Sequence, residues 1–341
     1  MRSTTNFHSG HQWHERSRGY PESAVSTTNQ LGAGRGAGYA GISRSVMRIR
    51  DTAHRMLHHD TRAAVTIADT IASFTRSTTW ELVDELPLRF DAFHPQGMTR
   101  VGSTWWVSTV DIDRRRGLVL AIDGDGQLVE QIPVGDDARY HPGGMDFDGE
   151  AFWIASAEYR PNSSATIYRM TPGGQPEHVF EVDDHVGAIA RCGPNGDLVG
   201  WSWGSRRFYR WSVEGRLVAA TVNPGFFVDH QDCQWLETGH LLCGGVAEVG
   251  LADGPGWLGG IGLLRVEDLI MAREVPFPRY QLATGRVGTH NPIWSEVRDA
   301  QLVVHLLPND GHGEILSYAT PLVGLPSRAR PLLCGSATTA Q

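Results

Sequence analysis

Lysine is absent from this sequence: all 30 basic residues of the 341-residue chain are arginines. This excludes a Schiff-base lysine, a P-loop lysine and a lysine general base. Binding of phosphate or carboxylate groups stays open, because the guanidinium fork of arginine suits both oxyanions.

Cysteines are few and long apolar runs are missing. The four cysteines, Cys192, Cys233, Cys243 and Cys334, contain no C-x-x-C pair, so we expect buried, reduced thiols rather than a disulfide framework. No run approaches 18 apolar residues, and the N-terminus lacks the apolar core of a signal peptide. We therefore predict a cytoplasmic protein that does not enter a membrane.

Acidic residues outnumber basic ones, 38 to 30, which gives a formal net charge of −8. The excess lies in the main body, because residues 1–79 hold ten arginines against only five acidic residues. An acidic body argues against nucleic-acid binding, since attraction to phosphates dominates that affinity. It is compatible with holding a cation, and we expect a monomer that acts on a small molecule.

The composition divides the chain into an extension, a main domain and a tail. Residues 1–79 begin rich in Ser, Thr, Gly, Arg and His, which predicts disorder, and the apolar spacing at 47–75 predicts a short helix. Residues 80–320 alternate short Val, Ile and Trp runs with turn signals such as P-N-D-G at 308–311, the pattern of an all-β domain. Residues 321–341 remain as a C-terminal tail.

Histidine recurs once per repeat in the main domain. The five positions are His94 in FHPQGM, His141 in YHPGGM, His185 in DDHVGAI, His230 in VDHQDC and His290 in THNPIW. The intervals are 47, 44, 45 and 60 residues, the last lengthened by a glycine-rich stretch at 248–260. Such periods, with four short strands each, are typical of propeller blades. We predict a five-bladed β-propeller in which an N-terminal strand at 80–88 completes the last blade and removes its open edge.

The propeller geometry brings these histidines to one end of a central channel. In a blade the first strand lines the channel, and each histidine precedes or opens a first strand. The loop between the second and third strands lies on the same face. The segments 158–162, 202–207 and 248–260 should therefore overhang the histidines.

Converging imidazoles predict a metal site. We expect three or four of the five to bind one divalent transition ion (Zn, Fe or Mn), since neutral nitrogen ligands suit these ions better than calcium. Gln231, Asp232 and Glu296 are expected to orient the imidazoles as hydrogen-bond partners. A purely structural origin stays open, because repeats inherit the same residue by duplication and histidine can also cap a turn.

Polar residues in the overhanging loops supply candidates for catalysis and substrate binding. Glu158 and Tyr159 are expected to move protons. Substrate contacts are expected from Gln96, Arg160, Asn162, Arg206 and Arg207. The tryptophans, including Trp203, are expected mostly to pack between strands.

Several phrases of the sequence carry a resemblance: HPQGM, YHPGGMDFDG, AEYRPNS, VDDHVG, HQDCQW and, most specific, SWGSRRFYRW. Over about residues 80–320 the chain resembles an uncharacterised family of bacterial and fungal propeller proteins that carries a domain of unknown function. The resemblance implies the propeller and no activity. Residues 1–79 lie outside it.

Three functions follow from these features. The first is a metal-dependent hydrolase or lyase that acts on a small polar or anionic organic molecule. The second is a non-catalytic binding module in which the histidines are structural. The third is a non-haem iron oxygenase.

Overall fold

The computed structural model describes residues 61–323 apart from 76, 193–195, 226, 237, 252–253, 278–279 and 282–284. One helix, α2 (Thr61–Ala72), precedes a series of antiparallel strands. The part of the predicted helix before residue 61, the disordered arm and the tail beyond residue 323 lie outside the described residues. In the described part, no helix is long and apolar enough to span a membrane.

The strands form successive four-stranded meanders, each made of neighbours in sequence. The first is β2 (His94–Val101), β3 (Thr104–Asp111), β4 (Arg116–Ile122) and β5 (Leu128–Val134). The second is β6 (His141–Phe147), β7 (Phe152–Ala157), β8 (Ala165–Met170) and β9 (Glu177–Val182). The third is β10 (Val186–Cys192), β11 (Asp197–Ser202), β12 (Arg207–Trp211) and β13 (Leu217–Val222), with the 3-10 turn η1 (Trp203–Ser205) after β11. A short parallel contact between β6 and β10 joins the second and third into one sheet.

Two further sheets complete the series. One is β14 (Asp229–Trp235), β15 (His240–Leu251), β16 (Gly254–Arg265) and β17 (Ile270–Phe277). The other is β20 (Ile293–Arg298), β21 (Gln301–Leu306), β22 (Glu314–Pro321) and, from the start of the chain, β1 (Glu81–Pro87). A two-stranded ribbon, β18 (Tyr280–Gln281) and β19 (Arg286–Val287), lies between them in sequence. The predicted pairing of the segment 80–88 with the last sheet is confirmed by the register of β1 on β22.

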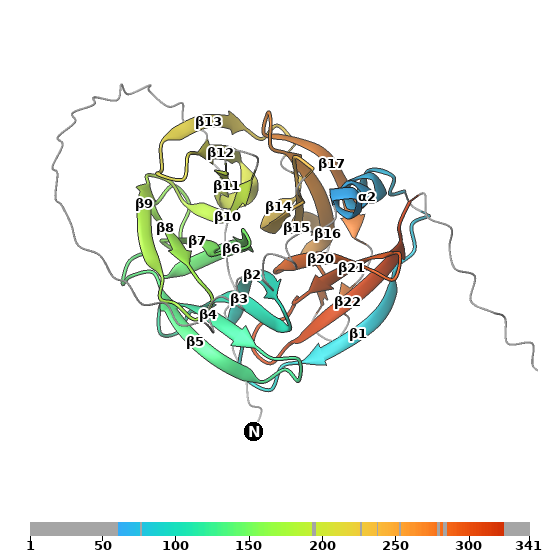
Figure 1. Ribbon diagram of the computed structural model, residues 1–341, viewed down its shortest axis with the longest axis horizontal. Helices are drawn as coiled ribbons and strands as arrows, with labels where there is room; N and C mark the ends of the chain where they lie inside the picture. The colour runs from blue at the N-terminus through green and yellow to red at the C-terminus, as the bar shows by residue number, and fades with distance from the viewer. Residues whose placement is uncertain are drawn as a thin grey trace, which may run out of the picture. The chain divides into compact units, whose positions relative to one another are not determined.

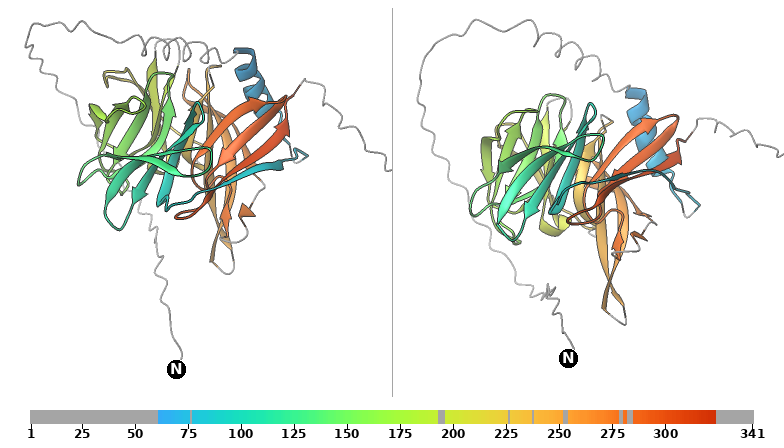
Figure 2. Two further views of the ribbon diagram at one scale, coloured as in Figure 1. Left: turned by 60° about the horizontal axis from the view of Figure 1, so that its bottom comes forward. Right: turned by 90° about the horizontal axis from the view of Figure 1, so that it is seen from below.

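The first strands of the meanders lie innermost. Strands β2, β6, β10, β14 and β20 contact one another in this order, and β20 contacts β2 again. Figure 1 shows them around a common centre, with the later strands of each meander farther out. The β15/β16 hairpin is longer than its neighbours, and Figure 2 shows it extending past the ends of the other sheets, on the side away from α2.

Helix α2 packs into the core of the sheets. Ile67, Ile71 and Phe74 share one apolar cluster with strand residues such as Leu263 and Leu316. The guanidinium of Arg273 donates to the carbonyl of Phe74 (2.7 Å). Burial of the apolar side of this short helix supplies stability that a 12-residue helix lacks by itself. The last part of the predicted 1–79 extension, from α2 onward, therefore packs against the sheets and belongs to the main domain.

A carboxylate at the centre ties the inner strands together. The Asp232 carboxylate on β14 accepts hydrogen bonds from the main-chain N–H groups of Met98 (2.9 Å), Met145 (3.1 Å) and Ile293 (3.2 Å), which belong to β2, β6 and β20. Asp232 is completely buried, and this burial raises the pKa of its carboxyl well above the ordinary value. Asp232 therefore joins four meanders through their main chains. The prediction that its carboxylate orients one of the five repeated histidines is wrong.

Asp146 makes a similar link between β6 and β14. Its carboxylate accepts from the N–H groups of Phe147 (2.9 Å) and Trp235 (2.8 Å). Burial, with a smaller contribution from the charge of Asp148, raises the pKa of Asp146 to about 7. The folded protein thus holds a proton here that the unfolded chain releases near pH 4.

This raised pKa predicts a pH-dependent stability. Because the folded-state pKa of Asp146 lies above the unfolded one, its contribution to the free energy of unfolding is complete below about pH 4 and is lost as the pH rises to about 7. Asp146→Asn should remove this loss. As the pH rises from 4 to 8, the free energy of unfolding of the native chain should therefore fall by a few kcal/mol more than that of the variant. Urea unfolding at both pH values measures the difference. The exposed Asp113→Asn is the control, and an equal pH slope in the Asp146 variant and the native chain would contradict the assignment.

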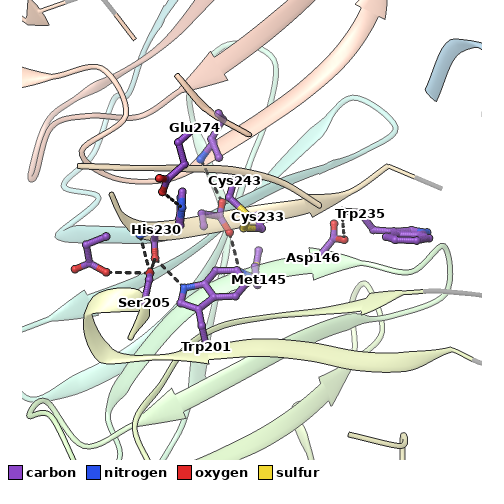
Figure 3. Close-up of a disulfide and its surroundings, with 12 residues drawn as sticks. Met145, Asp146, Trp201, Ser205, His230, Cys233, Trp235, Cys243 and Glu274 are labelled. Carbon is purple, nitrogen blue, oxygen red and sulfur yellow. Dashed lines mark hydrogen bonds and ion pairs between the residues drawn. A yellow bond between two sulfur atoms is a disulfide. The ribbon is translucent and has the colours of Figure 1, made fainter. Parts of the chain in front are cut away.

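The cysteine prediction was wrong for two residues. Cys233 and Cys243 face each other across β14 and β15, with Cα atoms 4.1 Å apart, and form a disulfide (Figure 3). This Cα spacing belongs to closely spaced cross-strand pairs. Cys192 is a free, buried thiol as expected, and Cys334 lies outside the described residues. The prediction of a cytoplasmic location stays untested and receives no support from the disulfide pair.

Candidate functional site

Four of the five predicted histidines gather where the inner strands begin. His94 and His141 open β2 and β6, and His185 directly precedes β10. The ring centroids of His94 and His141 are 6.5 Å apart, and those of His141 and His185 are 5.5 Å apart. His290 precedes β20 and lies close enough to His94 for a charge on His94 to lower the pKa of His290. We call these four residues the mouth histidines.

His94 is oriented by a carboxylate. Its Nδ1 lies 2.9 Å from Oδ1 of Asp310, and its Nε2 lies 2.9 Å from the amide nitrogen of Gln96. The same Gln96 nitrogen donates to the carbonyl of Pro95 (3.0 Å), which identifies it as the donor. In this arrangement Nδ1 of His94 donates to Asp310, and the lone pair of Nε2 accepts from Gln96. Gln96, predicted to bind substrate, covers that lone pair.

Asp310 belongs to a small charged network beside the mouth. Arg286 forms two hydrogen bonds to its carboxylate, at 2.9 and 2.6 Å, and Asn291 adds a third at 3.2 Å. Burial would raise the pKa of Asp310, but the hydrogen bond with His94 and the charge of Arg286 lower it to about 2. Asp310 thus stays ionised and fixes the ring of His94.

His185 is held by the main chain of the neighbouring loop. Its Nδ1 donates to the carbonyl of Glu158 (2.9 Å), which leaves Nε2 as the unprotonated nitrogen. Burial lowers the pKa of His185 to about 4, so the ring is neutral near pH 7. The ring packs edge-on against Trp203 with centroids 4.7 Å apart.

His141 and His290 are buried rings with a spare nitrogen. Among the described residues, Nδ1 of each has no hydrogen-bond partner. Burial, followed by the neighbouring His185 and His94, lowers the pKa of His141 well below its ordinary value. Burial and the charge of Arg286 lower the pKa of His290 to about 4. His141, His185 and His290 therefore offer neutral ring nitrogens near pH 7, and Gln96 covers Nε2 of His94.

Aromatic side chains border these imidazoles. Tyr159 stacks on His141 with ring centroids 4.3 Å apart, and burial raises the pKa of its hydroxyl. Trp203 lies 5.8 Å from Tyr159, and Trp257 on the long hairpin lies 5.5 Å from His290. The predicted overhang of the segments at 158–162, 202–207 and 248–260 is thus confirmed for these three residues. Trp203 lies beside His141 and His185 and is one of the few tryptophans expected not to pack between strands.

Glu158 and Arg160 are engaged with each other. The Glu158 carboxylate accepts two hydrogen bonds from the Arg160 guanidinium, at 2.9 and 2.7 Å, and two from Ser164. The bond from Arg160 lowers the pKa of Glu158. Asn162 shapes the same loop with a left-handed backbone (φ 50°). Of this loop, only Tyr159 has its ring against a mouth histidine.

His230 does not join the other four. It is the second residue of β14, and its ring lies beside Glu274 of β17, with Nε2 3.3 Å from Oε1 (Figure 3). Side chains alternate between the two faces of a strand, so a shift of one position sends His230 to the other face. The prediction that five histidines share one site needs this correction.

The remaining candidates also lie elsewhere. Glu296 accepts from His305 (Nε2 to Oε1, 3.3 Å), not from a mouth histidine. Gln231 donates weakly to the carbonyl of Asp229 (3.4 Å). Arg206 and Arg207 are exposed residues at the start of β12, where the charge of Arg206 acts on the carboxyl of Asp229.

Sequence reasoning missed Asp310, Arg286, Asn291 and Trp257. Asp310 stands in the P-N-D-G segment, which we had interpreted only as a hairpin turn. Its partner His94 is 216 residues away in the chain. Within the described part of the chain, no group of three or more His, Cys, Asp or Glu side chains is arranged to hold a metal ion in its present positions.

Meanders of four antiparallel strands around a common centre define a β-propeller-like protein. The chain belongs to a family of unknown function, DUF6454, whose sequence model matches residues 56–320. This confirms the resemblance and extends it to include α2. A search of curated proteins found no match.

Solved structures show distant similarity. A protein of unknown function from Bacteroides caccae is 12% identical with a TM-score of 0.40, over 64% of this chain and 72% of that one. Virginiamycin B lyase from Staphylococcus aureus is 12% identical with a TM-score of 0.34, over 70% of this chain and 99% of that one. A luciferin-regenerating enzyme is 10% identical with a TM-score of 0.41, over 71% and 80%.

Proposed function

We propose that the chain is a five-bladed propeller whose mouth histidines bind one divalent transition ion (Zn, Fe or Mn) and that it works as a hydrolase or lyase on a small polar organic molecule. The five blades would be the four-stranded meanders that begin at β2, β6, β10, β14 and β20. The proposal depends most on one observation: Nδ1 of His94 and Nδ1 of His185 are each held by an oxygen acceptor, which leaves Nε2 as the remaining ring nitrogen for a metal.

This hydrogen-bond pattern is the usual second coordination sphere of a metal-binding histidine. Such a histidine donates its other N–H to a carboxylate or a carbonyl, which fixes the tautomer and the ring. Asp310 serves His94 in this way, and the carbonyl of Glu158 serves His185. The low pKa values of His141, His185 and His290 support the proposal further, because a metal binds neutral imidazole.

The ring distances show how far the site is from a closed coordination sphere. Two imidazoles on one tetrahedral zinc ion have ring centroids about 5 Å apart, given bonds of about 2.1 Å. The pair His141–His185, at 5.5 Å, is near this value, whereas His94–His141, at 6.5 Å, is wider. Binding would therefore require His94 to approach and Gln96 to release its Nε2.

The neighbouring residues suit a small substrate. A bound ion would polarise a substrate oxygen or activate water. The half-buried rings of Tyr159 and Trp203 would contact the substrate, and the Tyr159 hydroxyl, which like any phenol is protonated near pH 7, could donate a proton. Arg286 lies close enough for its charge to act on the Tyr159 hydroxyl, and it would attract an anionic substrate while it holds Asp310.

Metal analysis of the purified chain tests the proposal. We expect one transition ion per chain to belong to the mouth, so the metal content measured by mass spectrometry should fall by about one equivalent in His141→Ala and in His185→Ala. His178→Ala on β9, a largely exposed histidine far along the same meander, is the matched control and should keep the ion. Equal metal content in all four proteins would contradict the site. Iron with oxygen consumption would instead support the oxygenase.

One observation favours a non-catalytic binding module: Gln96 already satisfies Nε2 of His94. Gln96→Ala separates the two functions. If the mouth binds metal, removal of the covering amide should raise metal affinity. If the contact is structural, the variant should lose stability and gain no affinity. The predictions of a monomer and of no nucleic-acid partner remain to be tested.

A further inference from the structure

His230 and Glu274 form a second polar cluster, inside the sheet β14–β17 and apart from the mouth. The side chain of His230 is completely buried and that of Glu274 is 20% exposed. Nε2 of His230 and Oε1 of Glu274 form an ion pair with each other, but among the described residues neither of these atoms, nor Nδ1 of His230, makes a hydrogen bond. Buried polar atoms without hydrogen bonds are rare and costly in native proteins. The ion pair alone therefore leaves the hydrogen-bonding capacity of these atoms unused.

The distance between the two side chains fits a shared ion. Nε2 of His230 lies 3.3 Å from Oε1 of Glu274 without hydrogen-bond geometry. Two donor atoms bound to one tetrahedral zinc ion, each about 2.1 Å from it, lie about 3.4 Å apart. The observed spacing is close to the bite of such a pair.

The main chain holds His230 firmly in this orientation. Its N–H donates to Oγ of Ser205 (2.8 Å), and its carbonyl accepts from Nε1 of Trp201 (2.8 Å), as Figure 3 shows. These bonds anchor the first strand of one meander to the second strand of the preceding one. They fix the main chain at position 230, from which the side chain leaves β14 on the face that meets Glu274.

Glycine and methionine complete the surroundings. A Cβ atom at Gly262 on β16 would lie 2.8 Å from Cε1 of His230 and 2.8 Å from Sδ of Met271. A side chain at position 262 would therefore press against both the imidazole and the thioether. Imidazole suits copper and zinc, and a thioether adds a preference for Cu⁺. The partly exposed Glu274 gives a route from solvent.

We propose that His230 and Glu274, with the sulfur of Met271 beside them, bind one late first-row transition-metal ion, Zn²⁺ or Cu⁺, within the sheet β14–β17. The site is independent of the proposed mouth site and does not rest on it. It accounts for Nε2 of His230 and Oε1 of Glu274, for the spacing of these two donors and for the glycine at position 262.

Titration of the full chain in a His141→Ala background, which removes the mouth site, tests the proposal. We expect one equivalent of Zn²⁺ to bind by calorimetry and one of Co²⁺ to give the visible absorption of a tetrahedral ion. His230→Ala and Glu274→Gln should each weaken binding at least tenfold. Gly262→Ala keeps both donors and should also weaken binding, because its methyl group fills the space between the ring and the sulfur.

The choice between the two ions has its own variant. Met271→Leu keeps the volume of the side chain and should lower the affinity for Cu⁺ while leaving that for Zn²⁺ unchanged if copper is the natural ligand. Binding that is unaffected by both His230→Ala and Glu274→Gln would overturn the proposal. Should His230→Ala fail to fold, Glu274→Gln and Gly262→Ala still decide, because unaltered binding in both would equally overturn it.

Discussion

Asp232→Ala is expected to lower the free energy of unfolding by about 3–6 kcal/mol, because it leaves three buried main-chain N–H groups without an acceptor. These groups belong to β2, β6 and β20, so the loss affects the contacts among four meanders at once. Urea unfolding followed by tryptophan fluorescence measures the change. The cooperativity of the transition should fall as well, since the inner strands lose the residue that joins them.

Two companion variants make this prediction specific. Asp232→Asn keeps one oxygen for Met98 and Ile293 but points an NH₂ group at the N–H of Met145, so its loss should be about half as large. Asp113→Ala, at an exposed position of a turn, should change stability by less than about 0.5 kcal/mol. Equal stability of Asp232→Ala and Asp113→Ala would exclude the central role of this carboxylate.

Gly143→Ala should be among the most damaging substitutions at a glycine of the described residues. A Cβ at this position would run into the main-chain carbonyl of Gly187, on the neighbouring strand β10. Main chain cannot move aside as a flexible side chain does, so we expect a loss of about 3 kcal/mol or a failure to fold. The melting temperature measured by circular dichroism reports the effect.

Gly124→Ala is the matched control for this change. Gly124 lies in a turn, and no atom lies within 4 Å of the position a Cβ would take. Its melting temperature should stay within a degree or two of the native value. If Gly143→Ala behaved in the same way, β6 and β10 would be farther apart in solution than the structure places them.

The repeat of histidines predicted the mouth because it followed the period of the strands. His94 and His141 stand at the same place in their strands, in FHPQGM and YHPGGM, and the structure brings their rings together. His230 was aligned with them by spacing alone. One position within a strand separates the two faces, and spacing counted over 45 residues does not resolve one position.

Partners distant in sequence could not be predicted from it. Asp310 and Arg286 reach His94 only because the last sheet lies next to the first, and no local pattern marks that contact. The disulfide has the same origin, since the hairpin register decides whether Cys233 and Cys243 face each other. Asp232 looked like one more polar residue beside a histidine. Its central place depends on the packing of four meanders.

Strand β1, near the beginning of the described chain, completes the sheet of β22, near its end. The N–H of Val323 also donates to Oγ1 of Thr70 in α2 (3.0 Å), which fastens the same two regions a second time. On the ribosome, the early segment must wait for its partner until β22 has been made. Synthesis that stops before residue 314 would leave an unpaired strand edge, so truncated products should be prone to aggregate and to be degraded.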